Sequence, residues 1–207
     1  MTAALDPAGF AAQMAVSRET LPRFEAYAAL LRRWSSRVNL VGRNTLGDLW
    51  RRHFLDSAQI RLYIPAGVQS VLDIGSGAGF PGLVLALLGV PGIELVESDG
   101  RKCAFLQEAI RITAAPATLR HARAETVPAR SYDVVTARAC APLDGLLTLA
   151  ERFIGRDTRC IFLKGERADA EIAEAARGWT MSVGLHRSLA DPRGAIVCLD
   201  GVGRARA

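Results

Sequence analysis

Four residues within one short stretch, and a fifth further along the chain, have the types and spacing of a nucleoside-binding site. The stretch reads D-x-G-x-G-x-G, with the acid at Asp73 and the glycines at Gly75, Gly77 and Gly79. Glycines at this spacing allow the chain to turn sharply and allow a ligand to approach bare backbone. Glu97 follows 22 residues after Gly75, at a distance where a carboxylate can accept hydrogen bonds from ribose hydroxyls.

Two nucleotide cofactors compete for this loop, a dinucleotide such as NAD and S-adenosylmethionine. The dinucleotide fingerprint is G-x-G-x-x-G, and its third glycine would stand where this chain has Phe80. A carboxylate at Asp73 would also repel a pyrophosphate, whereas it can face a cation or a hydroxyl group. S-adenosylmethionine is a ribonucleoside with a sulfonium and an amino-acid end, so the loop together with Glu97 favours it over NAD.

The residues after the fourth expected strand would face the transferred methyl group. This segment, TARACAPL (136–143), lacks the Asn/Asp-Pro-Pro-aromatic tetrapeptide with which many enzymes hold an exocyclic amine. Cys140 is the kind of nucleophile that cytosine-carbon methylation needs, but it has neither a Pro-Cys or Thr-Cys context nor an evident base, so we interpret it as a packing residue. The four cysteines and three histidines show no zinc-ligand spacing, so no metal is expected.

The hydrophobic pattern predicts the elements that position these residues. Ser17 is expected to cap a first helix, whose apolar stripe reaches Trp34, and a second helix is expected from Leu46 or Asp48 to Ile60. Beyond residue 70, apolar runs alternate with amphipathic stretches, which is typical of a parallel sheet covered on both faces. The expected strands are 70–74, 93–97, 118–121, 133–137, 160–163, 182–189 and 195–199, and the helices are 81–88, 100–113, 143–153 and 168–177.

These elements predict a doubly wound, mostly parallel α/β sheet with an antiparallel C-terminal hairpin. With the glycine loop, this is the Rossmann-like fold of class I S-adenosylmethionine-dependent methyltransferases. Residues 1–66 form an N-terminal helical extension in this interpretation, and residues 67–207 form the methyltransferase domain as one compact unit.

Six sequence blocks in a fixed order carry a family resemblance. They are WSSRVNL (34–40), RHFLDS (52–57), LDIGSGAGFPG (72–82), ESDGRKCAFL (97–106), RACAPL (138–143) and LKG (163–165). The R-H-x-x-D-S block and the G-F-P-G ending are specific to one family rather than general to methyltransferases. The chain resembles that family, the bacterial small-subunit (16S) ribosomal RNA guanine-N-7 methyltransferases, also called the glucose-inhibited division protein B family.

The resemblance implies roles for several residues on the cofactor side. It implies that Gly75 and Phe80 line the cofactor pocket, that Glu97 meets the ribose, and that Ala124 and Glu125 lie beside the adenine. Glu97 stands where many members have aspartate, which lengthens the carboxylate by one methylene without changing its role. The cofactor-binding residues expected in all are Asp73, Gly75, Gly77, Gly79, Phe80, Glu97, Ala124, Glu125 and Arg138.

Methylation of guanine nitrogen-7 would suit a site without a general base. This nitrogen has an exposed lone pair, so in-line attack on a sulfonium methyl group requires placement and dryness more than proton transfer. We expect Arg138 to orient the base through guanine O6 and flanking phosphates, and Lys164 to contact an RNA phosphate. A structural ion pair is the alternative for each of the two.

The N-terminal helices supply the remaining candidates. Asn39, Arg52, His53 and Asp56 are expected on the RNA side of the site, where they would close over it. A hydrogen-bonded brace between helices is the alternative for Asn39, His53 and Asp56, and His53 lies at no metal-ligand spacing.

Composition and charge limit the class of protein and its partners. The 207 residues are 50% hydrophobic, which is enough for one packed domain, and the longest apolar run is too short to cross a bilayer. The net charge is +5, and residues 1–66 hold nine arginines against five acids. Arginine suits phosphate and base edges, so we expect 16S rRNA or the small ribosomal subunit as partner of a soluble, cytoplasmic monomer without a membrane partner.

Two other functions stay open from the residues alone. One is an S-adenosylmethionine-dependent methyltransferase for a small metabolite, with the arginines merely solvated. The other is a non-catalytic binding module, which the intact glycine loop and Glu97 argue against.

Overall fold

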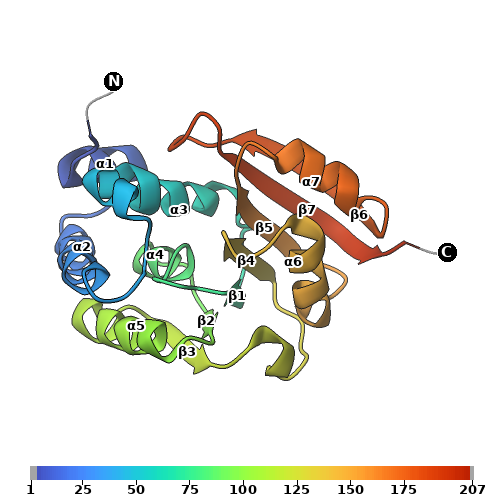
Figure 1. The fold of residues 1–207 in the computed structure, drawn as a ribbon, viewed down its shortest axis with the longest axis horizontal. Helices are drawn as coiled ribbons and strands as arrows, with labels where there is room; N and C mark the ends of the chain where they lie inside the picture. Colours follow the sequence, from blue (N-terminus) through green and yellow to red (C-terminus); the bar gives the residue numbers. More distant parts are fainter. Residues whose placement is uncertain (1–3, 206–207) are drawn as a thin grey trace.

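A seven-stranded sheet runs through the middle of the molecule (Figure 1). The structure, a computed structural model, describes residues 4–205, apart from the side chain of Arg43. The strands lie in the order β3-β2-β1-β4-β5-β7-β6, and β7 runs antiparallel to both of its neighbours while the other pairs are parallel. Their bounds are β1 Val71–Ile74, β2 Ile93–Glu97, β3 Ala117–His121, β4 Val134–Arg138, β5 Arg159–Lys164, β6 Trp179–Arg187 and β7 Ala195–Arg204.

The sheet confirms the expected fold class. From β1 the chain winds outward to β2 and β3, and it then returns to β4 on the other side of β1, so the winding direction changes between β1 and β4. Ligands bind at the carboxyl ends of the strands at such a switch point. The hairpin of β6 and β7 ends the sheet, as the missing helix between the two strands predicts.

Helices cover both faces of the sheet (Figure 1). One face carries the N-terminal helices together with α4 and α5, and the other carries α6 and α7, so that two hydrophobic clusters lie on opposite sides of the strands. The helices are α1 Pro7–Met14, α2 Leu21–Ser35, α3 Asp56–Ala58, α4 Gly82–Leu87, α5 Gly100–Thr113, α6 Leu143–Ala150 and α7 Ala168–Ala175. Shorter helical turns lie at η1 Arg43–Asp48, η2 Trp50–Leu55, η3 Gln59–Tyr63, η4 Ala124–Thr126 and η5 Glu151–Phe153.

The N-terminal region packs on the sheet domain through one shared core. Phe10, Phe24, Tyr27 and Phe54 are completely buried, and Tyr27 stacks on Phe80 of the glycine loop with the ring centroids 5.5 Å apart. Aromatic rings at this separation gain energy beyond the area they bury. The glycine loop therefore packs against a side chain from the N-terminal helices.

Three details of the N-terminal region differ from the sequence predictions. Ser17 makes the expected capping hydrogen bond, from the Thr20 N–H to its hydroxyl, but it closes the turn that precedes α2, and the helix itself begins at Leu21. The expected second helix is present as one continuous helical segment, but its type changes along the chain from η1 through the π-helix η2 to α3 and η3. Helix α1 was not predicted, although Asp6 before Pro7 is a recognisable start signal: its side chain accepts a hydrogen bond from the Gly9 N–H.

Within residues 4–205, the helices are all too short or too polar to cross a membrane.

Candidate active site

The glycine loop leaves the end of β1 with its backbone in a conformation that few side chains tolerate. Gly75, Gly77 and Gly79 have φ angles of 65°, 60° and 89°. A Cβ atom at Gly77 would meet only the Gly75 carbonyl oxygen, at 3.8 Å, so the space in front of this residue is open. Bare backbone facing open space is what a nucleoside cofactor needs, and the loop fits S-adenosylmethionine in this respect.

Asp73 is a buried brace of this loop. Its side chain is completely inaccessible, and its carboxylate accepts hydrogen bonds from the Gly82 N–H at 3.2 Å and from the Thr136 hydroxyl at 2.9 Å. Burial raises the pKa of Asp73 to about 6, against the hydrogen bonds that lower it. In this geometry Asp73 shapes the loop by joining β1, β4 and the start of α4, rather than facing a ligand.

Glu97 ties the same loop to the end of β2. One carboxylate oxygen accepts the Gly77 N–H at 2.8 Å, and the other accepts the N–H groups of Ser98 and Asp99, each at 2.8 Å. A carboxylate has about four acceptor positions, so these three donors leave room for about one more. We expect this carboxylate to receive one ribose hydroxyl rather than both.

The other expected cofactor residues lie at the same edge of the sheet, after β3. Ala124 is buried in η4, and Glu125 is exposed with its carbonyl oxygen bonded by Arg152. Their contact with an adenine ring stays a prediction.

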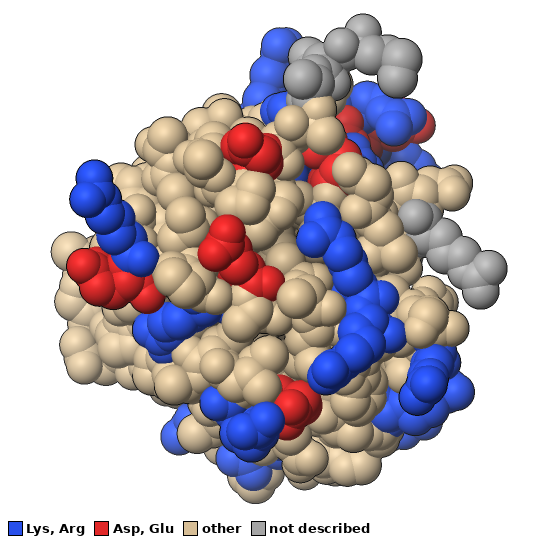
Figure 2. Space-filling model, turned by 90° about the vertical axis from the view of Figure 1, so that its left-hand side faces the viewer, with Lys and Arg blue, Asp and Glu red and all other residues tan. Residues whose placement is uncertain are grey.

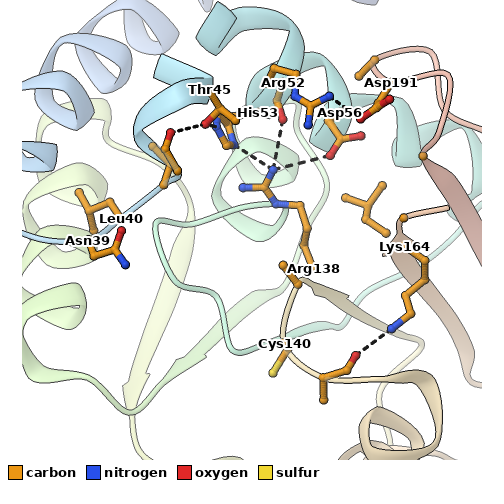
Figure 3. A pocket seen from close by; sticks show the side chains of 18 of the residues that line it. Asn39, Leu40, Thr45, Arg52, His53, Asp56, Arg138, Cys140, Lys164 and Asp191 are labelled. Atoms are coloured by element: carbon orange, nitrogen blue, oxygen red, sulfur yellow. Dashed lines mark hydrogen bonds and ion pairs between the residues drawn. The ribbon is translucent and has the colours of Figure 1, made fainter. Parts of the chain in front are cut away.

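A cavity of about 810 Å³ opens beside the glycine loop. Its walls come from four separate segments, 39–56, 138–142, 163–171 and 190–194, with Lys102 at its edge. The cavity contains all of the expected RNA-side residues: Asn39, Arg52, His53, Asp56, Arg138 and Lys164. Asn39 is exposed on the 39–42 loop, to one side of the other residues in Figure 3.

Arg138 lies at the centre of this group, at the end of β4 (Figure 3). Its Nη1 donates to His53 Nδ1 at 3.0 Å and to the Arg52 carbonyl oxygen at 3.3 Å, and it lies 3.6 Å from Asp56 Oδ2. The guanidinium also lies over the Phe80 ring, 4.8 Å from its centroid. Arg138 therefore bridges the glycine loop and the N-terminal helices.

The partners of Arg138 are fixed in turn by groups from distant segments. The Asp56 carboxylate accepts from Gln59 and from the Ser188 hydroxyl, and Arg52 pairs with Asp191 in the β6–β7 turn. Burial raises the pKa of Asp56, whereas burial and the nearby arginine charges lower the pKa of His53 to about 3. His53 and Asp56 therefore brace the helices and also line the cavity, and their contact with RNA stays a prediction.

Lys164 forms a structural ion pair, the alternative to a contact with an RNA phosphate. Its side chain is only 7% exposed, and its ammonium pairs with Glu171 at 2.6 Å and donates to the Ala141 carbonyl oxygen at 2.8 Å. Glu171 also accepts the Leu143 N–H. Lys164 thus fixes the loop after β4, and its ammonium is already neutralised where a phosphate would need it.

Cys140, which the sequence suggests is a packing residue, does pack on a neighbour, but it is exposed at the cavity. Cys103, Cys160 and Cys198 are buried, but Cys140 is exposed and lines the cavity. A Cβ atom at Gly75 would lie 2.7 Å from the Cys140 sulfur, so the thiol packs directly on the glycine loop. Although part of the residue is exposed, partial desolvation of the thiol raises its pKa, which disfavours the thiolate that a nucleophile needs.

Sequence reasoning missed several residues that complete the site. Tyr27 donates its buried hydroxyl to the Ala78 carbonyl oxygen and so holds the loop from α2, and Thr45, Gln59 and Asp191 fix the cavity wall. Tyr27 was visible only as one member of an apolar stripe. No local motif marks the other three, because their roles depend on contacts between segments far apart in the chain.

The comparisons with known proteins agree with this architecture. Solved structures with little sequence identity share the fold: a putative O-methyltransferase from Klebsiella pneumoniae is 16% identical with a TM-score of 0.59, covering 87% of this chain and 90% of that chain. A glycopeptide N-methyltransferase solved with S-adenosyl-L-methionine is 9% identical with a TM-score of 0.59, covering 72% of this chain and 93% of that chain.

Sequence relatives are much more similar. The ribosomal RNA small subunit methyltransferase G of Rhodospirillum rubrum is 52% identical, over 97% of this chain and 100% of that protein. The protein of the same name from Parvibaculum lavamentivorans is 44% identical, over 96% of this chain and 90% of that protein. The family model for rRNA small subunit methyltransferase G matches residues 20–193. The chain belongs to the rRNA small subunit methyltransferase G family.

Proposed function

We propose that this protein transfers a methyl group from S-adenosylmethionine to nitrogen-7 of a guanine in small-subunit (16S) ribosomal RNA. Family membership supports the RNA substrate, and the fold with its open glycine loop supports the cofactor. Nitrogen-7 is preferred over other acceptor atoms because of how the titratable side chains in the cavity are hydrogen-bonded.

None of the described titratable side chains at the centre of the cavity is free to act as a general base. Both ring nitrogens of His53 are hydrogen-bonded, the Asp56 carboxylate accepts from neutral donors and faces Arg138, and the Cys140 thiol has a raised pKa. Methylation of an exocyclic amine, a hydroxyl or a ring carbon requires removal of a proton. Guanine nitrogen-7 requires none, so the geometry suits this acceptor.

The bound cofactor would supply an electrophilic methyl group on a sulfonium. The chain would hold it by the open backbone at Gly77 and by the remaining acceptor position of Glu97. Arg138 would place the base, because a guanidinium can donate to guanine O6 beside the reacting nitrogen. Placement of this kind can supply much of the rate enhancement of a displacement reaction.

Exposed arginines on α2 and just after its end support RNA rather than a small metabolite as the substrate. Arg32, Arg33 and Arg37 are exposed, and none of them has an ion-pair partner within 4.0 Å among the described residues. Figure 2 shows the face that carries α1, α2 and α5, with Lys and Arg side chains gathered in a run on it. Exposed cations without an ion-pair partner attract a phosphate backbone. We also propose a cytoplasmic location, where such a substrate is found, and a monomeric state.

The substrate can be tested with labelled methyl groups. Small ribosomal subunits and naked rRNA from a strain that lacks the gene are incubated with methyl-labelled cofactor, and the RNA is digested to nucleosides. Label in N7-methylguanosine is expected. Label in another nucleoside would overturn the choice of atom, and the absence of label from both RNA substrates would favour a metabolite methyltransferase.

The basic surface can be tested with a matched pair of charge reversals. Arg33→Glu with Arg37→Glu should raise KM for RNA and reduce the salt dependence of binding by about one logarithmic slope unit per charge removed. The control, Arg156→Glu with Arg177→Glu, makes the same charge change at exposed positions away from α2, after η5 and after α7. Equal effects of the two pairs would show that only the net charge matters.

A further inference from the structure

The contacts of Arg138 divide its guanidinium into two halves. All three of its interactions with the N-terminal helices use Nη1, and Nη2 and Nε have no hydrogen bond to another described residue. In Figure 3, Nη2 points away from the three partners of Nη1. A guanidinium has five N–H donors in a rigid plane, so fixing one nitrogen fixes the direction of the others.

His53 makes the shorter of the two hydrogen bonds to Nη1. Its Nδ1 lies 3.0 Å from Nη1, whereas the Arg52 carbonyl oxygen lies at 3.3 Å and the Asp56 carboxylate at 3.6 Å. Arginine stays protonated in proteins and cannot accept a hydrogen bond, so Nδ1 must be the acceptor and carry no proton. The proton of the neutral ring therefore resides on Nε2.

A chain of donors beyond the ring leads to a loop of the cavity wall. His53 Nε2 lies 2.7 Å from the Thr45 hydroxyl, and that hydroxyl donates to the Gly42 carbonyl oxygen at 2.6 Å. Since the only proton of the hydroxyl is used, Thr45 must accept from Nε2. The sequence of donors has one direction, from Arg138 through His53 and Thr45 to Gly42, and Thr45 and Gly42 line the cavity.

We propose that His53 is a positioning residue, whose Nδ1 holds Nη1 of Arg138 in the cavity wall so that Nη2 and Nε face the substrate base. Thr45 fixes the ring in the tautomer that this requires. The environment of the ring agrees, because burial and two nearby arginine charges keep it neutral. The role rests on the proposed function, since the group to be bound by Nη2 and Nε is an oxygen of the RNA substrate, such as guanine O6.

Three substitutions at one position separate the two bonds of the ring. His53→Asn places an amide oxygen where Nδ1 was and retains the acceptor for Arg138. His53→Gln places its amide near Nε2 instead, so it retains the contact with Thr45 but loses the acceptor. His53→Ala loses both.

With small ribosomal subunits as substrate, kcat should depend on whether the variant keeps a hydrogen-bond acceptor for Nη1 of Arg138. We expect kcat to fall about 100-fold in His53→Ala and in His53→Gln, the cost of a misplaced catalytic group, with little change in the affinity for S-adenosylhomocysteine. His53→Asn should recover to within about tenfold of the wild type, the effect of one hydrogen bond with altered geometry. Thr45→Val should lower kcat in the wild-type background but not in His53→Ala, because the two residues act in series.

A purely structural role predicts another pattern. In that case kcat would follow the melting temperature across the set, His53→Gln and His53→Asn would be equivalent, and Thr45→Val would lower kcat equally in both backgrounds. Any of these results would overturn the proposal.

A spectroscopic measurement tests the same inference without activity. In protein labelled with ¹⁵N at histidine, the His53 ring, assigned by its loss in His53→Asn, should be neutral at pH 7 with its proton on Nε2. A proton on Nδ1 would overturn the acceptor role whatever the substrate is. If the wild type methylates no guanine but the tautomer is as expected, the proposed function fails while the contact to Arg138 stands.

Discussion

The two halves of the site are built in different ways. The cofactor half consists of the glycine loop and Glu97, and its hydrogen bonds join neighbouring strand ends through backbone N–H groups. The substrate half surrounds Arg138, and its hydrogen bonds join side chains from η2, β4 and the β6–β7 turn, up to 139 residues apart in the chain. Backbone geometry determines the first half, and tertiary packing of side chains determines the second.

This difference has consequences for how each half can fail. A backbone cradle is sensitive to added volume and to the loss of a glycine, because its shape is its function. A network of side chains is sensitive to the loss of a partner, because each buried polar group left without one is costly. The predictions below test this contrast.

The largest effects are expected from substitutions of Arg138, of which Arg138→Lys is the most informative. Lysine keeps the positive charge opposite Asp56 but loses the planar fork that reaches both the wall and the substrate. We expect kcat to fall by about 10³-fold, the scale for loss of a preorganised donor, while affinity for S-adenosylhomocysteine falls far less. Single-turnover methylation and calorimetric titration measure the two. Arg138→Ala should be inactive, and a fully active Ala variant would reduce Arg138 to scaffolding.

The cofactor half should be broken by a single methyl group at Gly79. A Cβ atom there would lie 2.6 Å from the Tyr27 hydroxyl and 2.9 Å from Leu83 Cβ, at a φ of 89°. Backbone strain and overpacking together should cost Gly79→Ala about 2–5 kcal/mol in the free energy of unfolding and abolish cofactor binding.

Gly67→Ala is the matched control for this change. Gly67 has a similar φ of 79° but nothing within 4 Å of the added Cβ atom. Only the backbone strain of about 1–2 kcal/mol should remain, with cofactor binding intact. Urea unfolding measures both variants, and equal losses would show that strain alone, not the close approach of Tyr27, governs the loop.

The same contrast explains what could be predicted from the sequence. The strands, the glycine loop and the position of Glu97 follow from local patterns, because alternating apolar runs and glycine spacing act over a few residues. The role of Lys164 depends on its ion pair with Glu171, and the role of Cys140 depends on its contact with Gly75. No local sequence pattern encodes either contact. The residues of the substrate half were identified through resemblance, whereas their partners Thr45 and Asp191 were not.

Opposite pH dependences should distinguish the two halves. The pKa of Asp73 is raised to about 6, so between about pH 4 and pH 6 the folded state binds more protons than the unfolded state at this group, and its contribution to stability falls as pH rises. The pKa of His53 is lowered to about 3, so the unfolded state binds more protons below its ordinary pKa of 6.5, and the contribution of this group falls as pH falls.

Two amide variants measure these contributions. Relative to the wild type, Asp73→Asn should gain stability as pH rises from 4 to 6, and His53→Asn should gain as pH falls over the same interval, each by up to about 1.4 kcal/mol per pH unit. The test is urea unfolding at several pH values, with the slope as the readout, because each variant also changes hydrogen bonds at all pH values. Parallel slopes would contradict the contrast between the halves.

The smallest effect is expected at the rim of the substrate half, where Arg52 pairs with Asp191. The Arg52 side chain is 36% exposed, so water and salt screen the pair, and a double-mutant cycle with Arg52→Ala and Asp191→Ala should give a coupling energy below about 1 kcal/mol that decreases with added salt. The buried contacts of Arg138 with His53 and Asp56 would then be the main polar support of the cavity, beside the shared aromatic core. A coupling energy above about 2 kcal/mol would contradict this ranking. It would mean that the Arg52–Asp191 pair, rather than the buried contacts of Arg138, is the main support of the cavity.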